Sequence, residues 1–418
     1  MAGVTTAREL GRAGLSVSVV EARERIGGRI YTIRDFCGAP VEAGAEFVHG
    51  VGAETWPDVR AAGLAVRPCP NRRDMMFNIG HGAHWLPWLL LHPGVWPTFT
   101  ILRAIARCKP PDMSARQFIE QRGYRGRART MAEMVLTAHL PGSIDEVGML
   151  GLLEDNVLKL ETGLNHRVAD GYDRLPAYIG RDLTVQFGFI VQTIEWGARG
   201  VTVRATDDRE IAAHTAVCTL PVGVLKSGAV RFLPDLSESK RRALQHLEMG
   251  PVLKVLLHFE ARFWPKRLAT LACGTGPITL YWPVFYGQED APAVLTAYCT
   301  GPRAAALARM SEGEAVAIIL ADLRRHFPKA HPKLNAHRRL DWAADPLACG
   351  GYTFLLPGGA GARARLAAPD TGALFWAGAE TATTAIAAAV QGAFTSGLRA
   401  AAEVRAFLER DGTGARGA

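Results

Sequence analysis

The chain has 418 residues, of which 48% are hydrophobic, and its mean hydropathy is close to zero. This length exceeds what a single hydrophobic core usually organises, so we expect two domains in a soluble globular protein. The formal net charge of +8 comes from scattered arginines. No recognised nucleic-acid-binding module accompanies them, so the charge does not indicate a nucleic-acid partner.

The cysteines and histidines indicate in which compartment the protein lies and whether it binds a metal. The seven cysteines are odd in number and show no C-x-x-C spacing, and no secretory signal is visible, so we expect a reduced, cytoplasmic protein. His81 and His84 form an H-x-x-H pair without an acidic or cysteine partner nearby, so no metal site is predicted. The apolar stretch 85–106 contains three prolines, which disfavours a spanning helix. It is interpreted as substrate-domain helices, with interfacial membrane contact as an alternative.

The chain opens like a dinucleotide-binding βαβ unit that lacks its first strand. Residues 2–10 are typical of its first helix, and the apolar and β-branched run 15–20 is typical of its second strand. Glu21 follows where such units place a carboxylate that binds an adenosine ribose. Of the fingerprint G-x-G-x-x-G, only the third glycine, Gly3, is present. We therefore expect Met1 to be an internal methionine of a G-x-G-M-A-G sequence whose start lies upstream.

The segment after Glu21 contains two adjacent glycines and an arginine, which suit a backbone turn held against phosphate. Residues 20–29 resemble the E-A-R-x-R-x-G-G-R segment of flavin-dependent amine oxidases, the family that includes monoamine and polyamine oxidases. The resemblance implies that Glu21 binds ribose and that Arg29 lies by the pyrophosphate. The segment's other residues expected to contact FAD are Ala22, Arg23, Gly27 and Gly28.

Two further segments resemble the same family, so the resemblance covers nearly the whole chain. Residues 374–381 are similar to a strand that ends in A-G-x-E-T, and they imply that Gly378, Glu380 and Thr381 contact FAD. The helix expected after them can face the pyrophosphate with its N-terminus. Residues 219–225 are similar to the family's t-x-P-l-g-v-L strand exit. Val191, in the strand-like segment 184–194, completes the middle part of the expected cofactor site.

Three segments carry the expected catalytic residues. Residues 253–264 resemble the K-V-x-L-x-F…F-W segment, whose lysine holds a water near flavin N5, so Lys254 is the first catalytic candidate. A surface lysine that snorkels is the alternative. Residues 42–50 resemble v-E-x-G-a-x-x-[IV]-[HE]-G, which places His49 in the active site. The alternative for His49 is a hydrogen-bonded structural histidine.

Residues 342–352 resemble the family's W-x-x-[DE]-x-x-x-x-G-x-Y stretch, which puts Trp342 beside the cofactor. Tyr352 and Phe375 correspond to the two aromatic rings that flank the amine in monoamine oxidases. Phe375 replaces a tyrosine, and a buried core aromatic is the alternative for it. Monoamine oxidases that bind FAD covalently have a cysteine directly before the tyrosine, where this chain has Gly351. We therefore expect noncovalent FAD.

The fold expected from this resemblance is α/β. A Rossmann-like, glutathione-reductase-like FAD-binding domain is assembled from residues 1–63, 163–250 and 342–410. An α+β substrate-binding domain comes from the two inserts 64–162 and 251–341, and residues 411–418 form a flexible tail. Helices are expected at 114–121, 130–140 and 312–326, and strands at 184–194, 201–204 and 252–259.

The expected activity is that of an FAD-dependent amine oxidase. A primary or secondary amine transfers a hydride to flavin N5, the imine hydrolyses to a carbonyl, and dioxygen reoxidises the flavin to give hydrogen peroxide. The expected partners are a small-molecule amine and O2, with no nucleic acid and no transmembrane anchor. An L-amino-acid oxidase or desaturase of the same fold, and a flavin-fold scaffold without catalysis, are the alternatives. The missing strand and glycines support the last of these.

Overall fold

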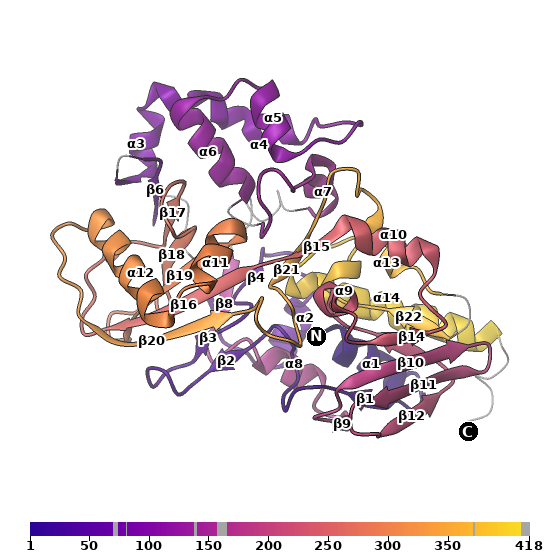
Figure 1. Ribbon diagram of the computed structural model, residues 1–418. Coiled ribbons are helices and arrows are strands. Elements are labelled where there is room, and N and C mark those ends of the chain that lie inside the picture. The colour runs from indigo at the N-terminus through magenta and orange to yellow at the C-terminus, as the bar shows by residue number, and fades with distance from the viewer. Residues whose placement is uncertain (70–73, 81, 138–139, 157–164, 371–372, 411–418) are drawn as a thin grey trace.

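The computed structural model describes residues 1–69, 74–80, 82–137, 140–156, 165–370 and 373–410, so His81 and the expected tail 411–418 lie outside the described residues. Figure 1 shows helices α3 to α6 grouped at the top, a large sheet with helices α11 and α12 at the left, and α1, α14 and several smaller sheets at the lower right. None of the seven cysteines forms a disulfide.

The N-terminal segment forms a helix that packs against the last helix of the chain. α1 (Ala2–Arg12) contacts α14 (Val390–Arg410) along its length. A Cβ at Gly397 would lie 2.6 Å from the backbone oxygen of Ala2, so the two helices approach closely only because this position is glycine. The first and the last helix of the chain therefore lie side by side in one layer.

Two short parallel strand pairs lie beside these helices. β1 (Val19–Val20) pairs with β9 (Val185–Gln186), and β13 (Ala216–Cys218) pairs with β22 (Leu374–Trp376). They are separate two-stranded ladders, and no strand of the described residues joins them. Segments far apart in sequence thus meet as parallel neighbours, which is the pairing typical of α/β units.

A four-stranded sheet follows in the middle of the chain. β10 (Val191–Gly197), β11 (Gly200–Ala205) and β12 (Glu210–Ala213) are antiparallel neighbours, and β14 (Arg231–Leu233) runs parallel to β10. The single strand predicted over 184–194 is wrong. Gly188, with φ of +62°, turns the chain between β9 and β10, so the two halves join different sheets.

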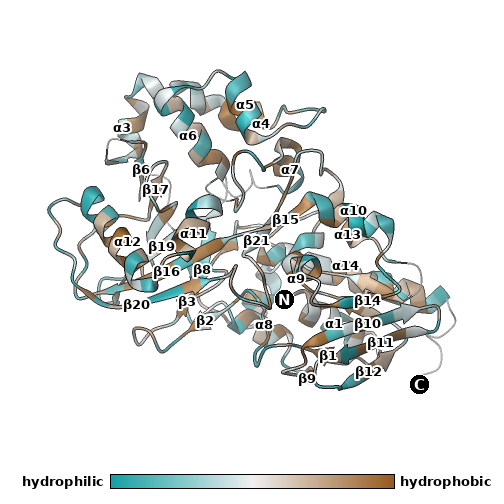
Figure 2. Cartoon of the chain, in the orientation of Figure 1, coloured by the Kyte–Doolittle hydropathy of each residue, from teal (hydrophilic) through white to brown (hydrophobic). Residues whose placement is uncertain are grey.

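The largest sheet has seven strands, and both inserts contribute to it. Its order is β20-β16-β19-β18-β17-β6-β7. All residues of β16 except His258 are buried, whereas β20 is polar and half-exposed, a contrast that Figure 2 shows as brown and teal. α11 (Gly301–Ala308) and α12 (Glu312–His326) pack onto it. The strands are β6 (Met75–Asn78), β7 (Ala83–Trp85), β16 (Val252–Phe259), β17 (Thr270–Cys273), β18 (Leu280–Pro283), β19 (Ala293–Thr300) and β20 (Leu334–Asp341).

A helical group covers one end of this sheet. α5 (Ala115–Gln121) begins with a capping box between Ser114 and Gln117, which satisfies its first free N–H groups. The apolar stretch 85–106 is divided into short helices by its prolines, as expected. In the described part of the chain, no helix is long and apolar enough to cross a membrane. The other members are α3 (Leu86–Leu90), η2 (Pro93–Thr100), α4 (Ile101–Ile105), α6 (Gly126–Thr137) and α7 (Met149–Glu154).

The remaining elements connect these layers. They are α2 (Trp56–Ala61), β2 (Thr32–Ile33), β3 (Val41–Glu42), β4 (Val48–His49), β5 (Val66–Pro68), β8 (Asn165–Val168), α8 (Arg174–Ile179), α9 (Val222–Ser227), α10 (Glu238–His246), β15 (Leu247–Gly250), β21 (Tyr352–Leu355), α13 (Ala362–Ala367) and η4 (Ala379–Thr381). β4 and β5 both pair with β8, which brings residues 48–49 beside 165–166.

Candidate functional site

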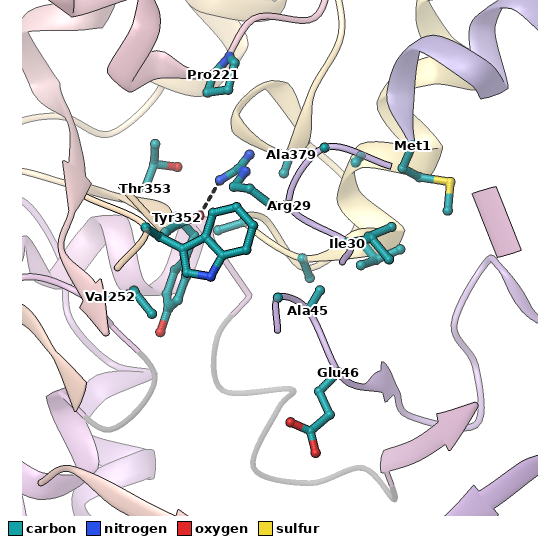
Figure 3. Close-up of a pocket in the computed structure, with 18 of the residues that line it drawn as sticks. Met1, Arg29, Ile30, Ala45, Glu46, Pro221, Val252, Tyr352, Thr353 and Ala379 are labelled. Carbon is teal, nitrogen blue, oxygen red and sulfur yellow. Dashed lines mark hydrogen bonds between the residues drawn. The ribbon is translucent and has the colours of Figure 1, made fainter. Parts of the chain in front are cut away.

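One cavity of about 1660 Å³ runs between the layers and is lined by residues from every major part of the chain. The close-up in Figure 3 shows Arg29, Ala379 and Pro221 on one side of Tyr352 and Glu46 on the other. One end is rich in glycine and charge, and the other end is apolar. We call them the polar end and the apolar end.

The polar end collects most of the residues expected to contact a dinucleotide. Gly27 and Gly28 have φ of +104° and +60°, a backbone conformation that favours glycine. A Cβ at Gly28 would meet nothing within 4 Å, so this turn leaves open space beside it. Its lining includes Gly3, Glu21, Ala22, Arg23, Gly27, Gly28, Arg29, Val191, Trp342, Gly378 and Glu380.

Ion pairs and backbone contacts hold these residues in place. The Arg29 guanidinium pairs with Glu380 and donates to the backbone oxygen of Gly351 over 2.6 Å. Arg23 pairs with Asp345 over 2.9 Å, and Glu21 accepts a hydrogen bond from the Arg23 backbone N–H. Segments 21–29, 345–351 and 380 are thereby fixed relative to one another.

This end fits a dinucleotide in its chemistry and its shape. The N-terminal turn of α1 lies on the cavity wall, where its N–H groups and dipole favour a phosphate. The glycine turn leaves room for the approach of phosphate oxygens, and the Glu21 carboxylate can accept from ribose hydroxyls. The residues present therefore agree with the expected cofactor.

Between the two ends lies a buried charged cluster centred on Lys254. Its Nζ donates to the backbone oxygens of Glu42 (2.8 Å) and Gly44 (3.1 Å) and to Oε2 of Glu46 (3.0 Å). An ammonium group has three N–H donors, so the three bonds leave none for a water. The expectation that Lys254 holds a water is not supported by this geometry, because protein oxygens occupy all its donors.

Glu46 is the carboxylate that joins the two cations of this cluster. Besides Lys254, it accepts from Nε of Arg167 over 2.7 Å and from the Trp282 indole N–H over 3.0 Å. Burial alone would raise the pKa of Glu46, but Lys254 and Arg167 hold that pKa below its ordinary value. The neighbouring Glu42 differs, because burial raises its pKa to about 8. The two carboxyl groups therefore differ: the nearby cations favour the ionised form of Glu46, whereas burial favours the protonated form of Glu42.

Aromatic and imidazole groups surround the cluster. The Tyr298 hydroxyl donates to the Tyr352 hydroxyl over 3.0 Å, and both rings line the cavity. Burial raises the pKa of Tyr352 to about 12, so its phenol is neutral. His49 also lines the cavity, and its Nδ1 lies 3.1 Å from Oδ1 of Asn165. These groups offer hydrogen bonds and ring faces to a small molecule.

Two of the expected site residues do not line the cavity. Phe375 is buried on β22 and packs with Leu10 and Phe407, its ring 5.7 Å from that of Phe407. The pairing of Phe375 with Tyr352 around an amine is therefore wrong, because β22 directs this ring toward α14. The Thr381 hydroxyl donates to the Gly378 backbone oxygen and accepts from Arg399, so it supports the turn from behind the wall.

Several residues of the site escaped sequence reasoning. Glu46 lies inside the segment that pointed to His49, at a position the family pattern leaves open. The available signal was a single charged residue within the otherwise uncharged run 43–48. Arg167, Trp282 and Tyr298 belong to no motif, and they reach the cluster only because β8, β18 and β19 fold against residues 42–49.

The apolar end is built by the helical group and by three strands of the large sheet. η2, α4 and α6 provide one side, and β6, β17 and β18 provide the other. Phe99 lines this end and is also 47% exposed, so it lies where the cavity reaches the surface. The apolar lining includes Met75, Phe77, Leu86, Phe99, Ile101, Leu102, Met131, Met134, Val135, Leu140, Ala269, Ala272 and Leu280.

Comparison with known proteins agrees with this geometry. Residues 1–405 match the sequence family described as flavin containing amine oxidoreductase. The chain is similar to polyamine oxidase 4 of Oryza sativa subsp. japonica, with 27% identity over 430 residues that cover 97% of this chain and 87% of the relative. It is 25% identical to lysine-specific histone demethylase 2 of Homo sapiens over 433 residues, which cover 97% of this chain and 52% of that relative.

Solved structures show the same fold. Putrescine oxidase bound to putrescine superposes with a TM-score of 0.85 at 22% identity, covering 97% of each chain. Cyclohexylamine oxidase from Brevibacterium oxydans IH-35A gives a TM-score of 0.85 at 21% identity, covering 98% of this chain and 97% of that one. The expected α/β fold class is thereby confirmed.

Proposed function

Because the chain belongs to the family of flavin-containing amine oxidoreductases, we propose that it is an FAD-dependent amine oxidase that converts a primary or secondary amine to an imine. The observation that carries this proposal is one continuous cavity, which joins an end that fits a dinucleotide to an apolar end of a size for a small molecule. The Lys254 cluster lies between the two, where an amine and the cofactor would meet.

The parts of the chain divide between two proposed tasks. Segments 1–63, 163–250 and 342–410 would form the FAD-binding domain, since the lining of the polar end comes mostly from them. Segments 64–162 and 251–341 would form the substrate domain, since they provide the apolar end and share the seven-stranded sheet. The cavity then runs from one domain into the other.

FAD, when bound, supplies the hydride acceptor at N5 and passes the electrons to dioxygen to give hydrogen peroxide. Gly27, Gly28 and Arg29 would hold its phosphates, and Glu21 its ribose. Lys254 would act by holding Glu46 and the backbone of residues 42–44 in place beside the reaction. Tyr352 and His49 would orient the amine, and the apolar walls would exclude bulk water.

We further propose that FAD is bound without a covalent link. Gly351, which lines the cavity, has no side chain to form one. The nearby thiol of Cys349 is not part of the lining and donates to the backbone oxygen of Pro346 instead. Acid denaturation is expected to release all flavin into the supernatant. Flavin that remains with the precipitated polypeptide would contradict noncovalent binding.

The amine oxidase proposal is tested by the visible spectrum of the purified protein. We expect flavin absorbance that bleaches when an amine is added without oxygen and returns when air is admitted, with one hydrogen peroxide formed per amine oxidised. A protein that binds flavin but is bleached by no amine would refute the proposed activity. A protein that takes up no flavin would refute the cofactor assignment as well.

A further inference from the structure

The acidic groups on the described part of the cavity wall are already committed to partners. Glu380 pairs with Arg29, and Asp155 pairs with Arg363 through two nitrogens, one of them at 2.9 Å. Glu46 pairs with both Lys254 and Arg167. Glu21 is the remaining acid on this wall, and it lies in the polar end. The apolar end therefore offers no unpaired carboxylate, among the described residues, to a second cationic group of a substrate.

The buried cluster itself carries an excess of positive charge. Lys254 and Arg167 bring two positive charges, and Glu46 brings one negative charge. The Glu42 side chain pairs with neither cation, because its carboxyl oxygens accept from the Thr32 hydroxyl (2.8 Å) and the Tyr172 backbone N–H (2.7 Å), and burial raises its pKa to about 8. The terminal nitrogens of Arg167 make no hydrogen bond to any described residue, and the side chain lines the cavity. A second ammonium group that approaches would be repelled by this excess charge.

In the described residues, the wall beyond the cluster is mostly apolar as far as the surface. Phe47 contacts Arg167 on one side, its ring 4.8 Å from the guanidinium carbon, and the Trp282 ring on the other. Trp282 packs in turn with Met134 and Leu280. At the far end Phe99 is half-exposed, and Trp96 and Leu91 near it are exposed too. The route from surface to cluster thus suits a hydrocarbon body.

From these three observations we propose that the substrate is a monoamine with an apolar body, and that di- and polyamines are selected against. Burying an ammonium group without a partner is strongly unfavourable, so a second charge would have to stay outside the apolar end. The Arg167–Glu46–Lys254 cluster acts as the determinant of this selectivity, together with the apolar lining that Phe99 begins. This inference rests on the proposed amine oxidase activity and names its substrate class.

The first experiment compares amines that differ only in a second amino group. Flavin reduction and steady-state kcat/KM are measured for hexylamine and for 1,6-diaminohexane, and then for decylamine and 1,10-diaminodecane. The monoamine of each pair is expected to react with a kcat/KM about 100-fold higher. A diamine that reacts as well as or better than its monoamine would overturn the proposal, while amine oxidation itself would still be established. Absence of reduction by all four amines would instead mean that the proposed function has failed.

The second experiment changes the charge of the apolar end. Phe99→Asp places a carboxylate at the mouth, and Phe99→Asn is the matched control with the same shape and no charge. We expect Phe99→Asp to raise kcat/KM for 1,10-diaminodecane about 10-fold above the value for Phe99→Asn, with little difference between them for decylamine. Equal kcat/KM for the diamine in the two variants would show that the substrate does not enter through the apolar end at Phe99.

The third experiment removes the excess charge of the cluster. Arg167→Met is expected to reduce the preference for monoamines about 10-fold. Arg67, which faces Arg167 across the β5–β8 ladder but is exposed and not part of the lining, provides the control Arg67→Met. Thermal unfolding of both variants verifies that they are folded. An equal loss of preference in both variants would contradict a specific role for Arg167.

Discussion

The two ends of the cavity are built in different ways. At the polar end, glycines and ion pairs fix the backbone, and Gly28 and the Arg29–Glu380 pair belong to short segments with a recognisable pattern. At the apolar end, side chains from η2, α6 and three strands of the large sheet meet without any shared pattern. The first end tolerates little change at single positions, whereas the second depends on the summed packing of many side chains. If the polar end binds the cofactor and the apolar end binds the substrate, as proposed, the two recognition tasks are separated in this molecule.

The contact between the polar end and the Lys254 cluster is tested most severely at Gly44. A Cβ there would lie 2.0 Å from the Arg29 backbone oxygen and 3.1 Å from the Trp342 ring. Gly44→Ala is therefore expected to destabilise the protein by at least about 3 kcal/mol and to abolish flavin binding. Thermal unfolding and the ratio of flavin to protein absorbance measure the two effects. Gly52→Ala is the control, because its Cβ would meet nothing within 4 Å, and a Gly44→Ala variant as stable as that control would contradict the rigid contact.

The junction of the two ends is tested through Lys254. Lys254→Met leaves the buried Glu46 with one cation instead of two, and a loss of about 100-fold in the rate of flavin reduction is expected, equivalent to about 3 kcal/mol. If Lys254 acts through Glu46, the same substitution made in a Glu46→Gln background should cost much less. Stopped-flow reduction of the two single variants and the double variant gives the coupling energy. Independent effects would show that Lys254 contacts the reaction by another route.

A smaller effect is expected from Glu42, whose backbone oxygen accepts a hydrogen bond from Lys254. The folded protein keeps a proton on Glu42 up to a pKa of about 8, whereas the unfolded chain releases it near 4.5. Its contribution to stability is therefore fully present below pH 4.5 and is lost as the pH rises through 8, by on the order of a few kcal/mol. In Glu42→Gln, the fall in melting temperature between pH 5 and 8 should be reduced.

The matched control for this pH dependence is Glu260→Gln, which alters an exposed carboxylate paired with Lys333 at the surface. It should retain the pH dependence of the original protein. A Glu42→Gln variant whose melting temperature falls with pH as steeply as that of Glu260→Gln would show that Glu42 is ionised in the folded state.

The difference between the polar end and the apolar end also explains which residues the sequence could predict. The α/β class and the residues of the polar end follow from local patterns, because a tight turn against phosphate requires glycines at fixed spacing. Of those residues, only Thr381 lies behind the wall instead of on it. Phe375 was misplaced because the orientation of a ring on β22 depends on which helix covers that face. Arg167 and Trp282 could not be predicted, since they reach Glu46 through contacts more than a hundred residues apart in sequence.

The smallest expected effect concerns a hydroxyl group at the border of the two ends. Tyr298→Phe removes the donor to the Tyr352 hydroxyl and leaves the rings in place, so a cost of about 1 kcal/mol and a few-fold lower kcat/KM are expected. Tyr281→Phe is the control, because it also removes a hydroxyl of a tyrosine in the same sheet, bonded to Asp322, outside the cavity lining. If the Tyr298–Tyr352 contact orients the amine, Tyr298→Phe should raise KM while Tyr281→Phe lowers only the melting temperature. Equal kinetics in both variants would confine the tyrosine pair to a structural role and leave the orientation of the substrate to His49 and the apolar walls.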